Sequence, residues 1–141
     1  MSINISKNSE IKQILALDYG KSKVGLAMAN TENKIAFTYA TLKNDKDFWQ
    51  KLAEIIQKED IKTIIIGISE HVKLKENEYK TREFGEELAK KFTQIKIEYQ
   101  NEMFTTKMAE ANLIERGAKK IKNFDDQESA RIILQSWLEK S

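Results

Sequence analysis

Three acidic residues, far apart in the chain, stand where predicted strands end or where a predicted helix begins. Asp18 closes an apolar run and is followed by Tyr19 and Gly20. A lone carboxylate is costly to bury, and Gly20 leaves room for a sharp turn, so we expect Asp18 at the rim of a sheet. The alternative interpretation of Asp18 is a turn or capping aspartate without a further role.

The other two acids are Glu102 and Asp126. Glu102 comes shortly after the last predicted strand and, taken alone, also fits an exposed loop acid. Asp126 opens the last predicted helix in phase with the apolar residues Ala130 and Ile133, so we expect its carboxylate to face the sheet. Stabilisation of the helix dipole is the alternative for Asp126. Its neighbour Asp125 lies on the polar face and is the predicted N-cap.

The chemistry that these acids could support is binding of a hard divalent cation. Carboxylate oxygens suit Mg²⁺ or Mn²⁺, whereas zinc favours nitrogen and sulfur ligands. The chain has no Cys and one His, His71, which excludes disulfides, thiolate sites and a His-rich centre. Two ions about 3.5–4 Å apart can hold the attacking water and the leaving oxygen of a phosphodiester. The sequence therefore predicts a Mg²⁺ or Mn²⁺ site, provided that the three acids share one rim.

Further residues could supplement this site. Glu70 follows the fourth predicted strand at the same rim and is an alternative ligand to Glu102, although an exposed loop acid is the simpler interpretation. His71 is a candidate proton shuttle or an exposed loop residue. Phosphate contacts would come from basic side chains, each of which could also be a solvated surface group. The candidates are Lys21, Lys23, Arg82, Lys119, Lys120 and Lys122.

Length and composition limit the class of protein. The chain has 141 residues, 33% of them charged, with a net charge of +2. We expect a flexible N-terminal tail at residues 1–10 and a single domain over 11–141. The near-balanced charge argues against a strongly basic nucleic-acid wrapper. The polar N-terminus and the lack of a long apolar run predict a soluble, cytoplasmic protein.

The elements that must position the acids follow from the hydrophobic pattern. The first three strands form an antiparallel meander, and helical crossovers then make strands one, four and five parallel. This predicts an α/β fold with a five-stranded mixed sheet of order 3-2-1-4-5, strand two antiparallel to strand one, and helices on both faces. The acids would lie at the carboxyl ends of the strands, where such sheets bind ligands. The predicted strands are 13–18, 22–29, 34–42, 61–68 and 94–99, and the predicted helices are 46–58 (N-cap Asp45), 79–92, 105–116 and 126–139.

Four segments together resemble the YqgF-type family, described as Holliday-junction resolvases or pre-16S rRNA nucleases with the ribonuclease-H-like fold. They are residues 16–27 (ALDYGKSKVGLA), 64–67 (IIIG), 101–110 (NEMFTTKMAE) and 125–138 (DDQESARIILQSWL). The resemblance implies catalytic and metal-binding roles for Asp18, Glu102 and Asp126, and it places a family arginine at Arg82. It implies a cytoplasmic, metal-dependent nuclease in rRNA maturation or recombination.

Asp18 would then bridge two ions, and Glu102 and Asp126 would each hold one. The expected partners are precursor rRNA or branched DNA and the ribosomal subunit, with no membrane, and the chain would be a monomer or a weak homodimer. The family's Asp-Glu-Arg reads Asn101-Glu102-Met103 here, and Lys23 replaces a common Arg. These departures keep open a catalytically weakened or inactive nucleic-acid-binding or ribosome-assembly module. An actin-like ATPase fragment, suggested by Asp18-Tyr19-Gly20, would need a second phosphate loop and a far longer chain.

Overall fold

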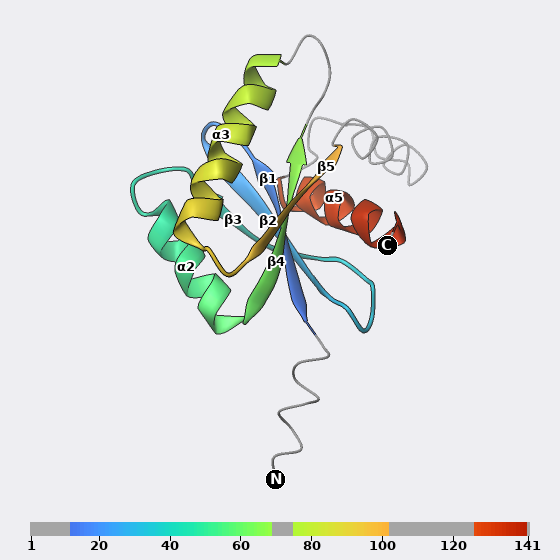
Figure 1. The fold of residues 1–141 in the computed structure, drawn as a ribbon. Helices are drawn as coiled ribbons and strands as arrows, with labels where there is room; N and C mark the ends of the chain where they lie inside the picture. Colours follow the sequence, from blue (N-terminus) through green and yellow to red (C-terminus); the bar gives the residue numbers. More distant parts are fainter. Residues whose placement is uncertain (1–11, 69–74, 102–125, 141) are drawn as a thin grey trace.

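The computed structural model describes residues 12–68, 75–101 and 126–140 (Figure 1). Within these ranges the hydrophobic pattern folds into five strands and three helices. The strands are β1 (Gln13–Tyr19), β2 (Lys23–Asn30), β3 (Phe37–Lys43), β4 (Ile61–Ile68) and β5 (Lys96–Asn101). The helices are α2 (Phe48–Lys58), α3 (Lys75–Lys91) and α5 (Asp126–Lys140).

The five strands form one mixed sheet of order β3-β2-β1-β4-β5, which confirms the predicted topology. β2 is antiparallel to both β1 and β3, and β4 is parallel to both β1 and β5. In the chain, α2 lies between β3 and β4 and α3 lies between β4 and β5. Each helix belongs to a crossover that returns the chain to the same end of the sheet before the next parallel strand. The carboxyl ends of β1, β4 and β5 therefore lie at one rim.

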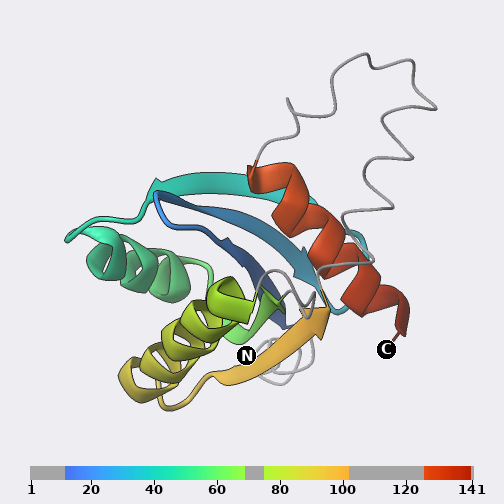
Figure 2. The ribbon, with the colours of Figure 1, turned by 90° about the horizontal axis from the view of Figure 1, so that it is seen from above.

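Helices cover both faces of the sheet, as predicted. Figure 2 shows α2 and α3 on one side and α5 on the other. Strand residues alternate between the two faces, so that Leu15 and Leu17 of β1 belong to the core under α2 and α3. Ile14 and Ala16 of the same strand belong to the core under α5. The apolar phase predicted for α5 is confirmed, since Ala130 and its partners on that face are buried.

The boundary of β3 differs from the prediction, because Lys34–Ala36 lie outside the strand. Lys34 adopts a left-handed conformation with φ of 56°. The Ala36 amide donates a hydrogen bond to Oε1 of Gln135 in α5 at 2.9 Å, and the amide of Gln135 donates to the Lys34 carbonyl at 3.3 Å. This segment is thus attached to α5 rather than to the sheet.

The predicted cap of α2 is also corrected. The N-cap is Asp47, which makes no side-chain capping bond, and not Asp45. Asp45 accepts a hydrogen bond from the Asp47 amide at 3.0 Å, so it organises the turn before the helix. The α3 helix begins four residues before the predicted start, at Lys75. The predicted helix 105–116 and the predicted cap Asp125 lie outside the described residues.

Candidate functional site

Asp18 lies near the carboxyl end of β1, directly opposite Gly25 of β2. It shares its phase along the strand with Ile14 and Ala16, which pack under α5. Residues paired across an antiparallel ladder project to the same face, so Asp18 and Gly25 both face α5. The strand alternation therefore directs this carboxylate away from α2 and α3.

Gly25 is the point at which the first turn of α5 meets the sheet. A Cβ built on Gly25 would overlap the backbone carbonyl of Asp126 and would lie 2.8 Å from the Asp126 side-chain Cβ. Only a glycine allows so close an approach of a helix backbone to a strand. Because Gly25 is the cross-strand partner of Asp18, the first turn of α5 brings Asp126 near Asp18 on this face of the sheet. Both residues are partly buried.

The turn between β1 and β2 adds positive charge beside this place. Gly20 permits the tight turn, since a Cβ there would lie 2.6 Å from the Lys23 carbonyl oxygen. Lys21 and Lys23 are exposed, and Lys23 pairs across the ladder with exposed Lys43. Like charges directly opposite each other are unfavourable, so an anion at this rim would relieve their repulsion. Lys43 was missed from the sequence because its pairing with Lys23 depends on the β2–β3 register.

The β5 strand contributes a polar residue to the face under α5. Trp137 of α5 donates a hydrogen bond from its indole nitrogen to Oε1 of Glu98 at 3.1 Å, which shows that Glu98 faces α5. Gln100, two residues further along, shares this face. Gln100 is only 5% exposed, and its buried Oε1 has no hydrogen-bond partner among the residues that the structure describes. The sequence analysis did not select Gln100, since nothing in its local sequence distinguishes a buried strand glutamine from an exposed one.

The available donors fit a hard divalent cation. Asp18 and Asp126 offer carboxylate oxygens and Gln100 offers an orphaned amide oxygen, which is the oxygen chemistry that Mg²⁺ and Mn²⁺ select. Within the described ranges, no group of three His, Cys, Asp or Glu side chains is close enough to form a metal site. The third predicted acid, Glu102, and the alternative Glu70 lie outside those ranges, as do His71 and the lysines Lys119, Lys120 and Lys122.

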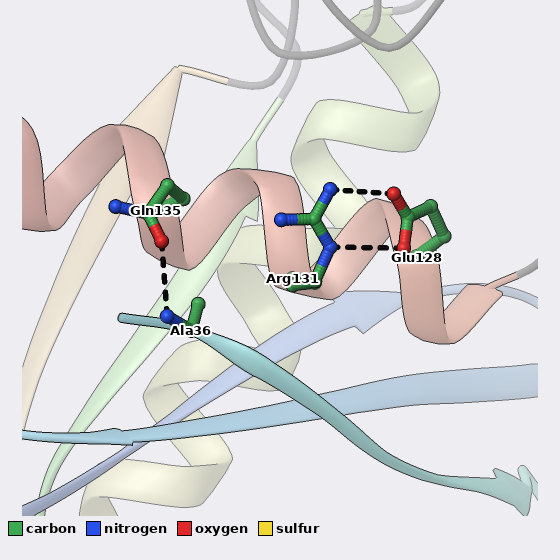
Figure 3. A network of polar contacts seen from close by, with 4 residues as sticks. All are labelled: Ala36, Glu128, Arg131 and Gln135. Atoms are coloured by element: carbon green, nitrogen blue, oxygen red, sulfur yellow. Dashed lines mark hydrogen bonds and ion pairs between the residues drawn. The ribbon is translucent and has the colours of Figure 1, made fainter. Parts of the chain in front are cut away.

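The first turns of α5 also hold an ion pair, shown with the Gln135–Ala36 bond in Figure 3. Nε of Arg131 donates to Glu128 at 2.9 Å, and a second guanidinium nitrogen donates to the other carboxylate oxygen. The hydrogen bonds that Arg131 donates to Glu128 raise the pKa of Arg131, against the opposing effect of burial. Glu128 thus offsets the charge of Arg131 within two turns of Asp126.

Arg82 lies on the other face of the sheet from Asp18. Its guanidinium carbon lies 5.3 Å from the centre of the Tyr99 ring of β5, the geometry of a cation–π contact. Burial raises the pKa of the Tyr99 hydroxyl; the Arg82 charge opposes this and Glu86 reinforces it. Arg82 is itself exposed on the second turn of α3. The structure therefore does not bring Arg82 together with Asp18 and Asp126 on the α5 face.

A hollow with a volume of about 460 Å³ also lies on the α2 and α3 face. Tyr19, the residue after Asp18, stacks on Phe84 with ring centres 4.4 Å apart, and Phe84 stacks on Trp49 at 5.3 Å. Neighbouring residues of β1 thus serve opposite faces, an acid toward α5 and an aromatic ring toward this hollow. Its lining residues are Tyr19, Asn44, Trp49, Lys80, Glu83, Phe84 and Glu87.

Comparisons with known proteins agree with this architecture. Residues 12–140 match the family model described as RuvX, Holliday junction resolvase. A protein of Porphyromonas gingivalis named "Putative pre-16S rRNA nuclease" is 34% identical and covers 90% of this chain and 96% of its own length. A protein of the same name from Sulfurihydrogenibium is 32% identical, with 92% of both chains covered.

Two solved structures share the fold. The RuvC protein of T. thermophilus, solved with a Holliday junction substrate, has a TM-score of 0.60 at 16% identity over 92% of this chain and 94% of its own. The Fowlpox virus resolvase, solved with Holliday junction DNA, has a TM-score of 0.54 at 14% identity over 91% and 97%. Among the described helices, none is long and apolar enough to cross a membrane.

Proposed function

Because this chain belongs to the RuvX family of Holliday junction resolvases, we propose that it is a divalent-metal-dependent endonuclease that cleaves phosphodiester bonds in structured nucleic acid. The names of its relatives favour precursor 16S rRNA as the substrate. Branched DNA is the second substrate class, in line with the family description. We propose the cytoplasm as its compartment and a monomer or a weak homodimer as its oligomeric state.

One observation carries this proposal: the backbone of Asp126 rests on Gly25, the cross-strand partner of Asp18. Two acids separated by more than a hundred residues are thereby held on one face at the carboxyl end of β1. Like charges at close range repel each other unless a cation lies between them. The contact at Gly25 brings two like charges together, and a bound cation would stabilise that arrangement.

In the proposed site, Asp18 and Asp126 hold the metal from the sheet and from α5. Glu102 is the third ligand, as the resemblance of Asn101-Glu102-Met103 to the YqgF-type pattern implies. Glu70 is the alternative third ligand. A bound Mg²⁺ or Mn²⁺ would supply charge stabilisation and an activated water. The basic residues of the chain would bind and orient the phosphate, and no side chain is required as a covalent nucleophile.

The basic side chains of the rim support binding of the phosphate backbone. Lys23 and Lys43 project from β2 and β3 on the same face as Gly25, two residues closer to the rim. Lys21 lies in the adjoining turn. We assign the same role to Lys119, Lys120 and Lys122 from the sequence, while Arg82 would reach the substrate from the α3 side.

The first test is cleavage of a labelled precursor 16S rRNA fragment and of a four-way DNA junction, each with Mg²⁺ or Mn²⁺ and with EDTA. We expect metal-dependent cleavage by the wild type and a loss of at least about a hundredfold in Asp18→Asn and Asp126→Asn, as for removal of groups that stabilise charge at the reacting centre. Asp60→Asn is the matched control, since Asp60 is an exposed acid after α2 that pairs with Lys62. Equal cleavage by Asp18→Asn and Asp60→Asn would contradict the proposed site.

The alternative function is a nucleic-acid-binding or ribosome-assembly module without cleavage. Asn101 and Met103, which stand where the YqgF-type pattern has Asp and Arg, favour it. Salt-dependent binding of both substrates without metal-dependent cleavage would select this function. Each phosphate contact adds about 0.9 to the slope of log affinity against log salt on a duplex. A slope that does not fall in the Lys23→Ala, Lys43→Ala double variant would exclude the basic rim from either function.

A further inference from the structure

Gln100 has a buried amide oxygen that a cation in the proposed site could bind. Gln100 is 5% exposed, and within residues 12–68, 75–101 and 126–140 its buried Oε1 has no hydrogen-bond partner. A buried acceptor left unsatisfied costs about 1–3 kcal/mol. Such groups in folded proteins usually have a water, an ion or a functional partner. The position of Gln100 in the sheet indicates which of these applies.

Gln100 lies in the same row of the sheet as the acids. It pairs in register with Gly67 of β4. The β1–β4 pairing runs through Leu17 and Ile66, so the next step of this ladder sets Asp18 beside Gly67. All three residues share the face under α5, as Ile65 of β4 does in the core there. The row therefore runs from Gly25 through Asp18 and Gly67 to Gln100.

Gly67 leaves the centre of this row without a side chain. Asp18 and Gln100 are two strand spacings apart, about 10 Å between Cα atoms. The Asp18 carboxylate and Gln100 Oε1 are both hydrogen-bond acceptors, so they cannot satisfy each other directly. The separation of the two strands suits a cation or its bound water between the two oxygens, because Mg²⁺–oxygen bonds are about 2.0–2.1 Å and Mg²⁺ keeps several of its waters.

We propose that Gln100 Oε1 forms a divalent-cation subsite with Asp18 across Gly67, binding the ion directly or through one of its waters. This inference rests on the proposed function and adds a ligand from β5 that the three-acid site does not contain. The amide oxygen brings no charge, so it adds affinity without increasing the repulsion among the carboxylates. It also accounts for the unpartnered oxygen.

The test is Mn²⁺ binding by the full-length chain, measured by calorimetry and by the Mn²⁺-induced rise in Tm. In Gln100→Leu we expect a Tm above that of the wild type without metal, because an unsatisfied buried amide is replaced by an apolar group of similar size. We expect its Mn²⁺ dissociation constant to rise roughly ten- to a hundredfold, the range seen when a supporting ligand is lost. Gln100→Glu should bind Mn²⁺ more tightly than the wild type and should melt lower without metal at neutral pH.

Gln135→Leu is the matched control. Gln135 is an amide on the same side of the sheet, but its oxygen and nitrogen are both bonded, to Ala36 and Lys34. This variant should melt below the wild type and should bind Mn²⁺ unchanged. The opposite signs of the two Tm shifts distinguish an orphaned amide from a structural one.

The outcomes separate this inference from the proposed function. If Asp18→Asn loses Mn²⁺ binding while Gln100→Leu and Gln100→Glu both bind as the wild type does, the subsite is wrong and the carboxylate site stands. If the wild type binds no Mn²⁺ at millimolar concentration, or if Asp18→Asn binds it normally, the proposed function fails as well. If Gln100→Leu does not fold, unchanged affinity in Gln100→Glu is sufficient to overturn the subsite.

Discussion

The two faces of the sheet are built from side chains of different size. Under α2 and α3 the core consists of large residues, among them Leu15, Leu17 and Phe48. Under α5 the strands present mostly alanines, Ala16 and Ala27 among them, with Gly25 where the helix begins. Large side chains bury more apolar area and contribute more stability. Small side chains let the helix backbone approach the strands. The face under α5 therefore buries less apolar area per residue but holds α5 close to the sheet.

The large core residues and the residues of the candidate site thus lie on different faces of the sheet. The acids Asp18 and Asp126 and the amide Gln100 all belong to the small-residue face. The aromatic stack of Tyr19, Phe84 and Trp49 belongs to the other face. A substitution under α2 should therefore change the free energy of unfolding with little effect on the site. A substitution under the start of α5 should impair the site at a smaller loss of unfolding free energy.

The largest expected effect on stability is that of Phe48→Ala. Phe48 is 1% exposed and contacts the rings of both Trp49 and Phe84. Truncation leaves a cavity and should lower the free energy of unfolding by about 3–5 kcal/mol, measured by urea denaturation. Mn²⁺ affinity at a temperature where the variant is folded should stay within about twofold of the wild type, since distant sites with no shared partners act independently. A large loss of affinity would show that the two faces are coupled.

Gly25→Ala should have the opposite profile. The added methyl group overlaps the Asp126 backbone, so the start of α5 must move away from β2. Overpacking of this kind costs about 1–3 kcal/mol. A displacement of about 1 Å at a reacting centre can cost a hundredfold in rate, so metal-dependent cleavage should fall by about that factor. Ala27→Gly, on the same strand and face, is the control that alters packing without moving Asp126. Equal cleavage by Gly25→Ala and the wild type would refute the role of this contact.

The sequence was sufficient for the sheet order and for the faces of Asp18 and Asp126. Strand alternation, crossover handedness and the helical phase of Asp126 are local or topological, and each can be deduced without coordinates. Three features could not be predicted in this way. They are the contact between Gly25 and the Asp126 backbone, the pairing of Lys43 with Lys23, and the unpartnered oxygen of Gln100. They depend on register and on packing between segments far apart in the chain. The start of β3 was misplaced for the same reason, because the partner of Ala36 is Gln135 in α5.

The smallest expected effect concerns the polar contact that holds α5 to the edge strand β5. Burial of the Glu98 carboxylate works to raise its pKa, but hydrogen bonds from Lys96 and Trp137 and the charges of Lys96 and Lys140 outweigh burial and lower it. A carboxyl group with a lowered pKa in the folded state stabilises the fold above its unfolded pKa, about 4.3 for Glu. This contribution is lost as the pH falls through the folded-state pKa.

Glu98→Gln should therefore reduce the free energy of unfolding at about pH 6 by only about 0.2–1 kcal/mol, since the Lys96–Glu98 ion pair is largely exposed and screened by solvent. At an acidic pH below the folded-state pKa, the carboxyl group is protonated in both states, and the difference between variant and wild type should approach zero. Urea denaturation of the two proteins at both pH values measures this change. A difference that persists at the acidic pH would assign the effect to the shape of the side chain rather than to its charge. Cleavage should be unaffected at neutral pH, because Trp137 contacts Glu98 at the opposite end of α5 from Asp126.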